Sequence, residues 1–182
     1  RLETMAPLAA TDEAGNAVGK PTLGRVKIAL PADAAAEAPA PTHAPDGAAN
    51  LDNRVRLLGY DLPDDPVAPG QTVPLTLYWQ VLGPVGGDYQ VFVHLAAADE
   101  TLAGQGDGPP LNGEYPTSFW GTGETLADAR TLQVAADATP GEYRLWVGLY
   151  RLENGVRLPA LADDGTPAGD RLFLDTVAIA AP

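Results

Sequence analysis

The chain has 182 residues with 24 Asp or Glu and 11 Lys or Arg, which gives a formal net charge of −13. This charge excludes an ordinary nucleic-acid binder, which needs basic patches that neutralise phosphate, and it disfavours anionic membrane surfaces. The chain has no cysteine for disulfides or thiolate metal sites. No apolar run approaches the length of about 18 residues that direct membrane insertion requires.

The beginning of the chain resembles its end. Residues 1–31 align with residues 151–182 at an offset of 150, which becomes 151 beyond Gly19. The matched positions include Arg1-Leu2-Glu3 with Arg151-Leu152-Glu153, and Leu8, Gly15, Leu23, Val26 and Ile28 with Leu158, Gly165, Leu174, Val177 and Ile179. Similarity at a fixed period indicates tandem modules. We therefore expect residues 1–31 to be the C-terminal strands of a preceding copy in a longer polypeptide. They should dock on that copy, on a neighbouring chain or on an open edge of the next module.

Residues 32–50 are rich in Ala and Pro and contain no aromatic residue. Pro39, Pro41 and Pro45 oppose a helix and favour an extended conformation. The sequence predicts a linker here.

From residue 51 onward, apolar and polar residues alternate. Residues 71–81, 88–95 and 142–150 each place apolar side chains on one face, a pattern typical of half-buried antiparallel strands. The expected inward residues are Trp79, Tyr89, Val91, Val93, Leu95, Tyr143, Leu145, Val147 and Leu149. Residues 54–62, 125–135, 156–161 and 171–179 fit further strands, and the last two should close the core with Leu158, Leu172, Leu174, Val177 and Ile179.

About seven short strands separated by turns predict an all-β fold, an immunoglobulin/fibronectin III-like antiparallel β-sandwich over residues 51–182. The run Pro140-Gly141-Glu142-Tyr143 opens one of these strands. It resembles the tyrosine corner of such domains, in which a Tyr hydroxyl bonds to the backbone upstream. The alternative is that Tyr143 is simply an inward aromatic residue.

The residues available for catalysis are few, and we predict no enzyme and no cofactor. Ser118 is the only serine and lacks a nucleophile-elbow context, while His43 lies in the linker and His94 in the module. Residues 104–108 are Gly-rich, but Pro109-Pro110 follow where a dinucleotide fold needs a helix. A glycosidase pair among the carboxylates Asp107, Glu114, Glu124 and Asp128 stays open. So does a calcium site at Asp163, Asp164 and Asp170, although a solvated hairpin turn is the favoured interpretation of these three.

The long connection over residues 99–124 is a candidate binding element, because loops of that length in compact domains are often functional. It carries Tyr115 and Trp120, while Phe92, His94, Trp146 and Tyr150 should share the outer face of two neighbouring strands. Exposed aromatic rings of this kind stack on sugars. In the alternative, the loop folds over that face and forms a second small core.

Several runs carry a resemblance to a known family: Leu57-Leu58-Gly59-Tyr60, Val67-Ala68-Pro69-Gly70, Leu75-Thr76-Leu77-Tyr78-Trp79, Val91-Phe92-Val93-His94-Leu95, Asp107-Gly108-Pro109-Pro110, Tyr115-Pro116-Thr117 and Pro140-Gly141-Glu142-Tyr143. Together, over roughly residues 54–180, they resemble a β-sandwich module of Chloroflexi-type bacteria. That module lies at the extracytoplasmic C-terminus of membrane proteins related to family 39 glycosyltransferases (dolichyl-phosphate-mannose mannosyltransferases). The catalytic membrane domain has no counterpart here, so the resemblance implies an extracytoplasmic location and no transferase residues.

These observations predict a non-catalytic accessory or binding module of a larger surface, membrane or secreted protein, with glycan as one possible contact. The alternative is a structural repeat of a cell-surface stalk, layer or filament joined by strand complementation. The expected partners are the remainder of the same polypeptide or neighbouring copies.

Overall fold

The structure is a computed structural model that describes residues 10–11, 14, 17–18 and 40–181. The chain divides into two compact units, residues 1–35 and residues 36–182. In the first unit, β1 (Ala10–Thr11) and β2 (Ala17–Val18) pair antiparallel, and Ala14 lies in a turn. Outside the described residues lie the first part of the predicted linker and the predicted docking residues Leu8, Leu23, Val26 and Ile28.

The second unit consists of strands and two 3-10 turns, η1 (Pro110–Gly113) and η2 (Thr117–Phe119). Its strands are β3 (Asn50–Leu51), β4 (Val55–Asp61), β5 (Thr72–Val81), β6 (Gln90–Ala96), β7 (Leu102–Gln105), β8 (Thr125–Val134), β9 (Gly141–Tyr150), β10 (Ala160–Leu161), β11 (Pro167–Gly169) and β12 (Leu172–Ile179). They form one sheet in the order β11-β10-β3-β4-β5-β8-β7-β6-β9-β12. Among the described residues, no helix has the length and apolar character needed to cross a membrane.

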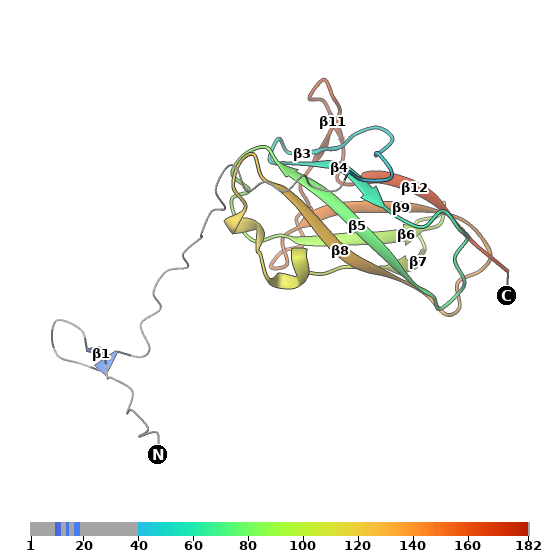
Figure 1. The fold of residues 1–182 in the computed structure, drawn as a ribbon, viewed down its shortest axis with the longest axis horizontal. Helices are drawn as coiled ribbons and strands as arrows, with labels where there is room; N and C mark the ends of the chain where they lie inside the picture. Colours follow the sequence, from blue (N-terminus) through green and yellow to red (C-terminus); the bar gives the residue numbers. More distant parts are fainter. Residues whose placement is uncertain (1–9, 12–13, 15–16, 19–39, 182) are drawn as a thin grey trace, which may run out of the picture. The chain divides into compact units, whose positions relative to one another are not determined.

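The sheet folds over at β7, so that β4, β5 and β8 form one layer and β6, β9 and β12 form the other (Figure 1). The short strand β7 pairs with β8 on one side and with β6 on the other. A parallel bridge between Val67 and Ile179 joins the two layers on the opposite side. The fold is an immunoglobulin-like antiparallel β-sandwich, as the strand pattern predicts.

The core lies between the two layers, and Trp79 is its largest fully buried side chain. All residues predicted to face inward are buried: Trp79, Tyr89, Val91, Val93, Leu95, Tyr143, Leu145, Val147 and Leu149. The closing residues are buried as well: Leu158, Leu172, Leu174, Val177 and Ile179. Both predictions are confirmed.

Two aromatic residues on the outward side of their strands are also buried, which a period of two does not predict. Tyr78 is 4% exposed, and its hydroxyl donates a hydrogen bond to Asp61 at 2.6 Å. Phe92 is 1% exposed because its ring fills the space beside Gly148, where a Cβ atom would lie 2.5 Å from the ring.

The tyrosine corner is present. The Tyr143 hydroxyl donates a hydrogen bond to the Thr139 carbonyl oxygen at 2.8 Å, four residues upstream. The bond fixes the turn that leads into β9, as in other immunoglobulin-like domains. Tyr143 is therefore both a tyrosine corner and an inward aromatic residue, since its ring also belongs to the core.

The described part of residues 32–50 lies along the edge of β4. His43 exchanges two main-chain hydrogen bonds with Tyr60, each 3.0 Å long. A side chain at Gly59 would collide with the His43 carbonyl oxygen and the Pro41 ring. Residues 41–43 thus contact three successive residues of β4, namely Gly59, Tyr60 and Asp61. We call residues 41–43 the clamp segment.

Candidate functional site

A row of directly opposed residues crosses the outer face of the sandwich. Trp146 of β9 lies between Phe173 of β12 and His94 of β6. His94 in turn lies opposite Gln105 of β7, and Gln105 lies opposite Gln133 of β8. Opposed residues share a face of the sheet, so the row leads from aromatic rings on one layer to amide side chains on the other.

Two arginines cover the aromatic end of this row. The Arg157 guanidinium lies 4.3 Å from the centroid of the Phe92 ring, and the Arg171 guanidinium lies 4.2 Å from that of Trp146. Arg171 makes two hydrogen bonds to Glu100, and these lower the pKa of the Glu100 carboxyl below its usual range. The structure therefore brings Phe92, His94 and Trp146 together, and the rings of Phe92 and Trp146 already have cationic partners. Tyr150 joins them through its ring, 6.3 Å from that of Phe92.

Tyr115 and Trp120 belong to a different part of the molecule. Trp120 is 5% exposed within the main core, and its Nε1 donates a hydrogen bond to the Tyr115 carbonyl oxygen at 3.0 Å. The Tyr115 hydroxyl donates to the Phe119 carbonyl oxygen and to Glu124. The long connection thus adds to the core between the layers, and it does not extend the aromatic outer face.

The three carboxylates predicted as a calcium site are in the hairpin β10–β11 and just after it. Asp164 accepts hydrogen bonds from the Thr166 amide and hydroxyl, which lower the pKa of its carboxyl. Asp170 forms an ion pair with Arg157 at 3.2 Å. Among the described residues, no group of three or more His, Asp and Glu side chains is placed to hold a metal ion.

The residues considered for catalysis have separate partners. The Ser118 amide donates to Asp88, while His94 Nε2 lies 3.2 Å from Asp107 Oδ2. In the part of the chain that the structure describes, no hydrogen bond links Ser118 to His94.

A groove of about 660 Å³ lies where β7 and β8 diverge. The two strands pair at Gly104 and Gln105, and the Ala135 amide after β8 donates to the Ala103 carbonyl oxygen at 2.8 Å. Beyond this point the chain follows β6, with the Gly106 amide bonded to Val93 and two hydrogen bonds between Gly108 and Val91. The Gly106 backbone still lies close to β8, because a Cβ atom there would collide with the Thr131 carbonyl oxygen. The groove is therefore a hollow on the exposed side of this junction.

Arg130 spans this opening. Its guanidinium donates to the carbonyl oxygens of Gly106, Gly108 and Pro109 at 2.9 to 3.0 Å. Its Nε donates to Asp128 at 2.7 Å, and Asp128 is fully buried. The second Asp128 oxygen accepts the Leu111 amide, so this ion pair fixes the course of the loop that forms one wall of the groove.

Three polar side chains of the groove make no hydrogen bond to any described residue: Gln105, Asn112 and Thr131. All three are exposed to solvent. Two others are already bonded. Asp107 accepts the Val93 amide, and Gln133 bonds to Thr72 and to the Gly70 carbonyl oxygen.

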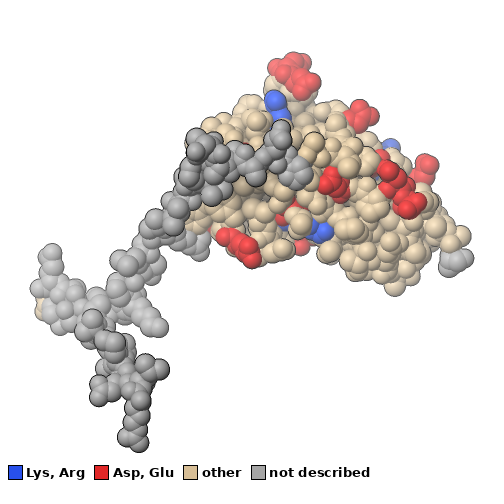
Figure 2. Space-filling view, viewed as in Figure 1, with Lys and Arg blue, Asp and Glu red and all other residues tan. Residues whose placement is uncertain are grey.

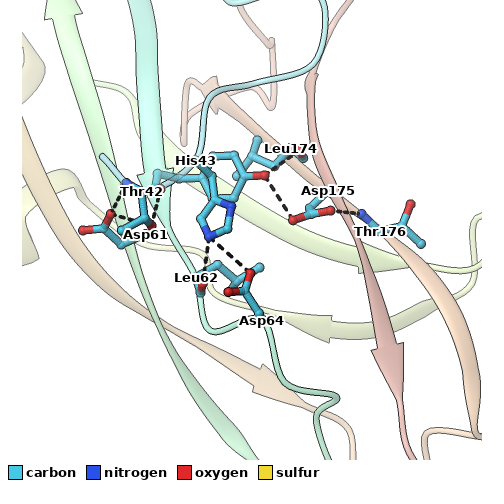
Figure 3. A network of polar contacts seen from close by, with 9 residues as sticks. Thr42, His43, Asp61, Leu62, Asp64, Leu174, Asp175 and Thr176 are labelled. Atoms are coloured by element: carbon cyan, nitrogen blue, oxygen red, sulfur yellow. Dashed lines mark hydrogen bonds and ion pairs between the residues drawn. The ribbon is translucent and has the colours of Figure 1, made fainter. Parts of the chain in front are cut away.

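A second polar network surrounds the clamp segment (Figure 3). The Thr42 amide and hydroxyl donate to Asp61 Oδ1 at 2.8 and 2.9 Å. Together with the Tyr78 hydroxyl, the strongest influence, they hold the pKa of Asp61 below its usual range. The His43 ring stacks on Tyr60 with centroids 5.1 Å apart, and its Nε2 faces the Leu62 carbonyl oxygen and Asp64. These contacts hold residues 41–43 against the edge of β4.

The charged side chains form no basic patch on the face drawn in Figure 2. Asp and Glu occur there as separate groups, with few Lys or Arg among them.

No family model matches the sequence, and no curated protein matches it. Among solved structures, the fold is similar to the crystal structure of the CARDB domain of the PF1109 protein from Pyrococcus furiosus in complex with di-metal ions. That likeness covers 80% of this chain and 99% of the other, with 15% sequence identity and a TM-score of 0.37. At this level of likeness, nothing about the ligands of that domain transfers to this chain.

Sequence reasoning found the residues of the aromatic face but missed the groove. The Gly-rich residues 104–108 could have indicated a groove. A glycine at every second position leaves one side of an extended chain without side chains, and space can remain there. The Asp128–Arg130 pair was not foreseeable, since charged residues two apart on a strand usually face solvent together.

Proposed function

We propose that this chain is part of a tandem array of non-catalytic immunoglobulin-like modules with a structural role in a larger extracytoplasmic protein. The observation that carries this proposal is that a residue pair of hairpin β1–β2 recurs in hairpin β10–β11, while the pair Ala10 with Val18 corresponds to Ala160 with Gly169 after a shift of one residue at the bulge in β10–β11. Thr11 pairs with Ala17 in the first hairpin, and Leu161 pairs with Pro167 in the second. Both differences, 161 − 11 and 167 − 17, equal the offset of 150 found in the sequence.

The pairing of hairpin β10–β11 indicates which strand should pair with hairpin β1–β2. β10 uses its other edge to pair with β3, through Ala160 with Leu51 and Leu161 with Asn50. A lone two-stranded hairpin is marginal in water because it cannot bury an apolar face. By the alignment, Ala10 and Thr11 should pair with the β3 of another copy. Such a joint between chains, repeated head to tail, gives a filament.

Further support comes from the site residues and the resemblance. Ser118 and His94 have separate partners, which favours a non-catalytic role. The extracytoplasmic location, at the cell surface or secreted, rests on the resemblance to modules of the glycosyltransferase-related membrane proteins.

A chimera tests the proposal. Residues 151–182 are replaced by residues 1–31 in the full chain, and unfolding is followed by circular dichroism and denaturant titration. If the two segments are equivalent, the chimera folds cooperatively, with reduced stability. A control carries the residues of 1–31 in shuffled order and should not fold cooperatively. A chimera that behaves like the shuffled control contradicts the equivalence.

Glycan contact is the second candidate function, and the outer row from Trp146 through His94 to Gln105 favours it. This row combines aromatic and polar groups, as sugar-binding surfaces do. A glycan array with the wild type and the Trp146→Ala variant tests which end of the row makes the contact. Loss of saturable binding in the variant would place the contact at the aromatic end, and retained binding would place it at the polar end.

A further inference from the structure

We infer that the groove between β7 and β8 is a binding site for a neutral, hydroxyl-rich ligand, specifically an oligosaccharide. The inference deepens the glycan candidate of the proposed function and does not depend on the tandem arrangement. It places the contact in the groove, at the polar end of the outer row.

The groove has the size and the polar groups of a ligand site. Its volume of about 660 Å³ lies within the range of about 300–1,000 Å³ typical of small-ligand sites. The carboxamides of Gln105 and Asn112 and the hydroxyl of Thr131 each donate and accept hydrogen bonds. Because they have no partner among the described residues, a ligand bonds to them without breaking a protein hydrogen bond.

The remaining lining residues argue against charged ligands. The Arg130 guanidinium is committed to three carbonyl oxygens and to buried Asp128, so it is not directed at an anion. Asp107 brings a negative charge to the groove and opposes anions further. A single carboxylate that already bonds to the Val93 amide and faces His94 is a poor cation site.

The same contacts argue against an added peptide strand. Strand addition requires unpaired main-chain groups at a sheet edge. Along the chain from Gly106 to Pro109, the carbonyl oxygens that point across the opening are bonded to Arg130. The groove also has no aromatic lining, and its larger apolar residues are only Leu102 and Pro109. Alternating hydroxyl and C–H groups of a sugar fit this mixture of amides, hydroxyl and small apolar surfaces.

The test uses the full chain and a panel of unbranched neutral oligosaccharides: cellotriose, mannotriose, maltotriose and chitotriose. Saturation-transfer NMR and calorimetric titration should detect saturable binding of at least one probe at millimolar concentration. Removal of hydrogen-bonding groups in Gln105→Ala should weaken binding about tenfold, which corresponds to about 1.4 kcal/mol.

A matched pair of variants fixes the location. Thr131→Trp fills the groove from the exposed face of β8 and should abolish binding, while Thr125→Trp adds the same ring to the same strand away from the groove and should not. Unchanged melting temperatures show that both variants fold.

Three results overturn the inference: no saturable binding of any probe, equal binding by Thr131→Trp and wild type, or stronger binding of a synthetic peptide with the sequence of residues 32–39. Binding lost in Trp146→Ala but kept in Thr131→Trp moves the sugar site to the aromatic end. That result contradicts the groove and retains the glycan candidate.

Discussion

The Tyr60 hydroxyl donates a hydrogen bond to the Leu174 carbonyl oxygen at 2.9 Å and thereby joins β4 to β12. The same hydroxyl bonds to Asp175 at 3.1 Å. The two strands belong to different layers, and the bond lies beside the bulge that interrupts β12 between Phe173 and Asp175. A buried side chain thus satisfies backbone that the irregular register leaves without a strand partner.

Replacing Tyr60 by Phe should reduce the free energy of unfolding by about 1–2 kcal/mol, because the Leu174 oxygen stays buried without its donor. Burial, reinforced by Asp175, raises the pKa of Tyr60 above its ordinary value. This contribution to stability is present below the unfolded pKa of about 10 and is lost as pH rises beyond it. Denaturant titrations from pH 7 to 11 should show a smaller alkaline loss in Tyr60→Phe. The control Tyr150→Phe removes a hydroxyl that has no hydrogen bond to a described residue. It should change neither the free energy of unfolding at pH 7 nor its loss at alkaline pH.

The clamp segment should loosen in acid. The lowered pKa of Asp61 means that its stabilising contribution is present above the unfolded pKa of about 4 and is lost as pH falls through the folded value. Hydrogen exchange should show loss of protection at the Thr42 amide between pH 5 and 3. In Asp61→Asn that protection should be low at both pH values. Asp64→Asn, at a carboxylate 90% exposed, is the control; if it has the same effect, the assignment to Asp61 is wrong.

Gly59→Ala should displace the clamp segment. The added methyl group would overlap the His43 carbonyl oxygen and the Pro41 ring. We expect a loss of about 1–3 kcal/mol, the usual cost of overpacking, together with faster exchange of the His43 amide. Gly83→Ala is the matched control, because its Cβ would meet only the Asn53 carbonyl oxygen at an ordinary 3.5 Å. Equal stability of the two variants would show that the clamp segment yields without cost.

Loss of the buried ion pair Asp128–Arg130 should reduce the free energy of unfolding far more than loss of the exposed pair Asp170–Arg157. Asp128→Asn removes the charge that compensates Arg130, whose side chain is 6% exposed, and should cost about 3–5 kcal/mol. Asp170→Asn breaks the exposed pair with Arg157 and should cost no more than about 1 kcal/mol. Thermal unfolding of the two variants at low and high salt provides the measurement. A small effect of Asp128→Asn would mean that the loop over residues 106–111 has other support.

Local sequence patterns predicted the long strands, their inward faces and the tyrosine corner, whereas β7 (Leu102–Gln105) lies inside the segment predicted as a long connection. These features depend on local alternation and on turn residues, so Trp79, Leu145 and Tyr143 could be placed without coordinates. The similarity between residues 1–31 and residues 151–182 is likewise a feature of the sequence.

Which side chains are free to contact a ligand depends on the tertiary structure. Phe92 and Trp146 were predicted on an outer face, but Arg157 and Arg171, from segments distant in sequence, cover their rings. Trp120 was predicted in a binding loop, and it packs into the core because the loop lies against the open end between the layers. The groove at Gln105 and Thr131 lies at the junction where β7 pairs with both β6 and β8. Strand pairing between the layers and side-chain cover depend on contacts between distant segments, and a local pattern of residues does not specify them.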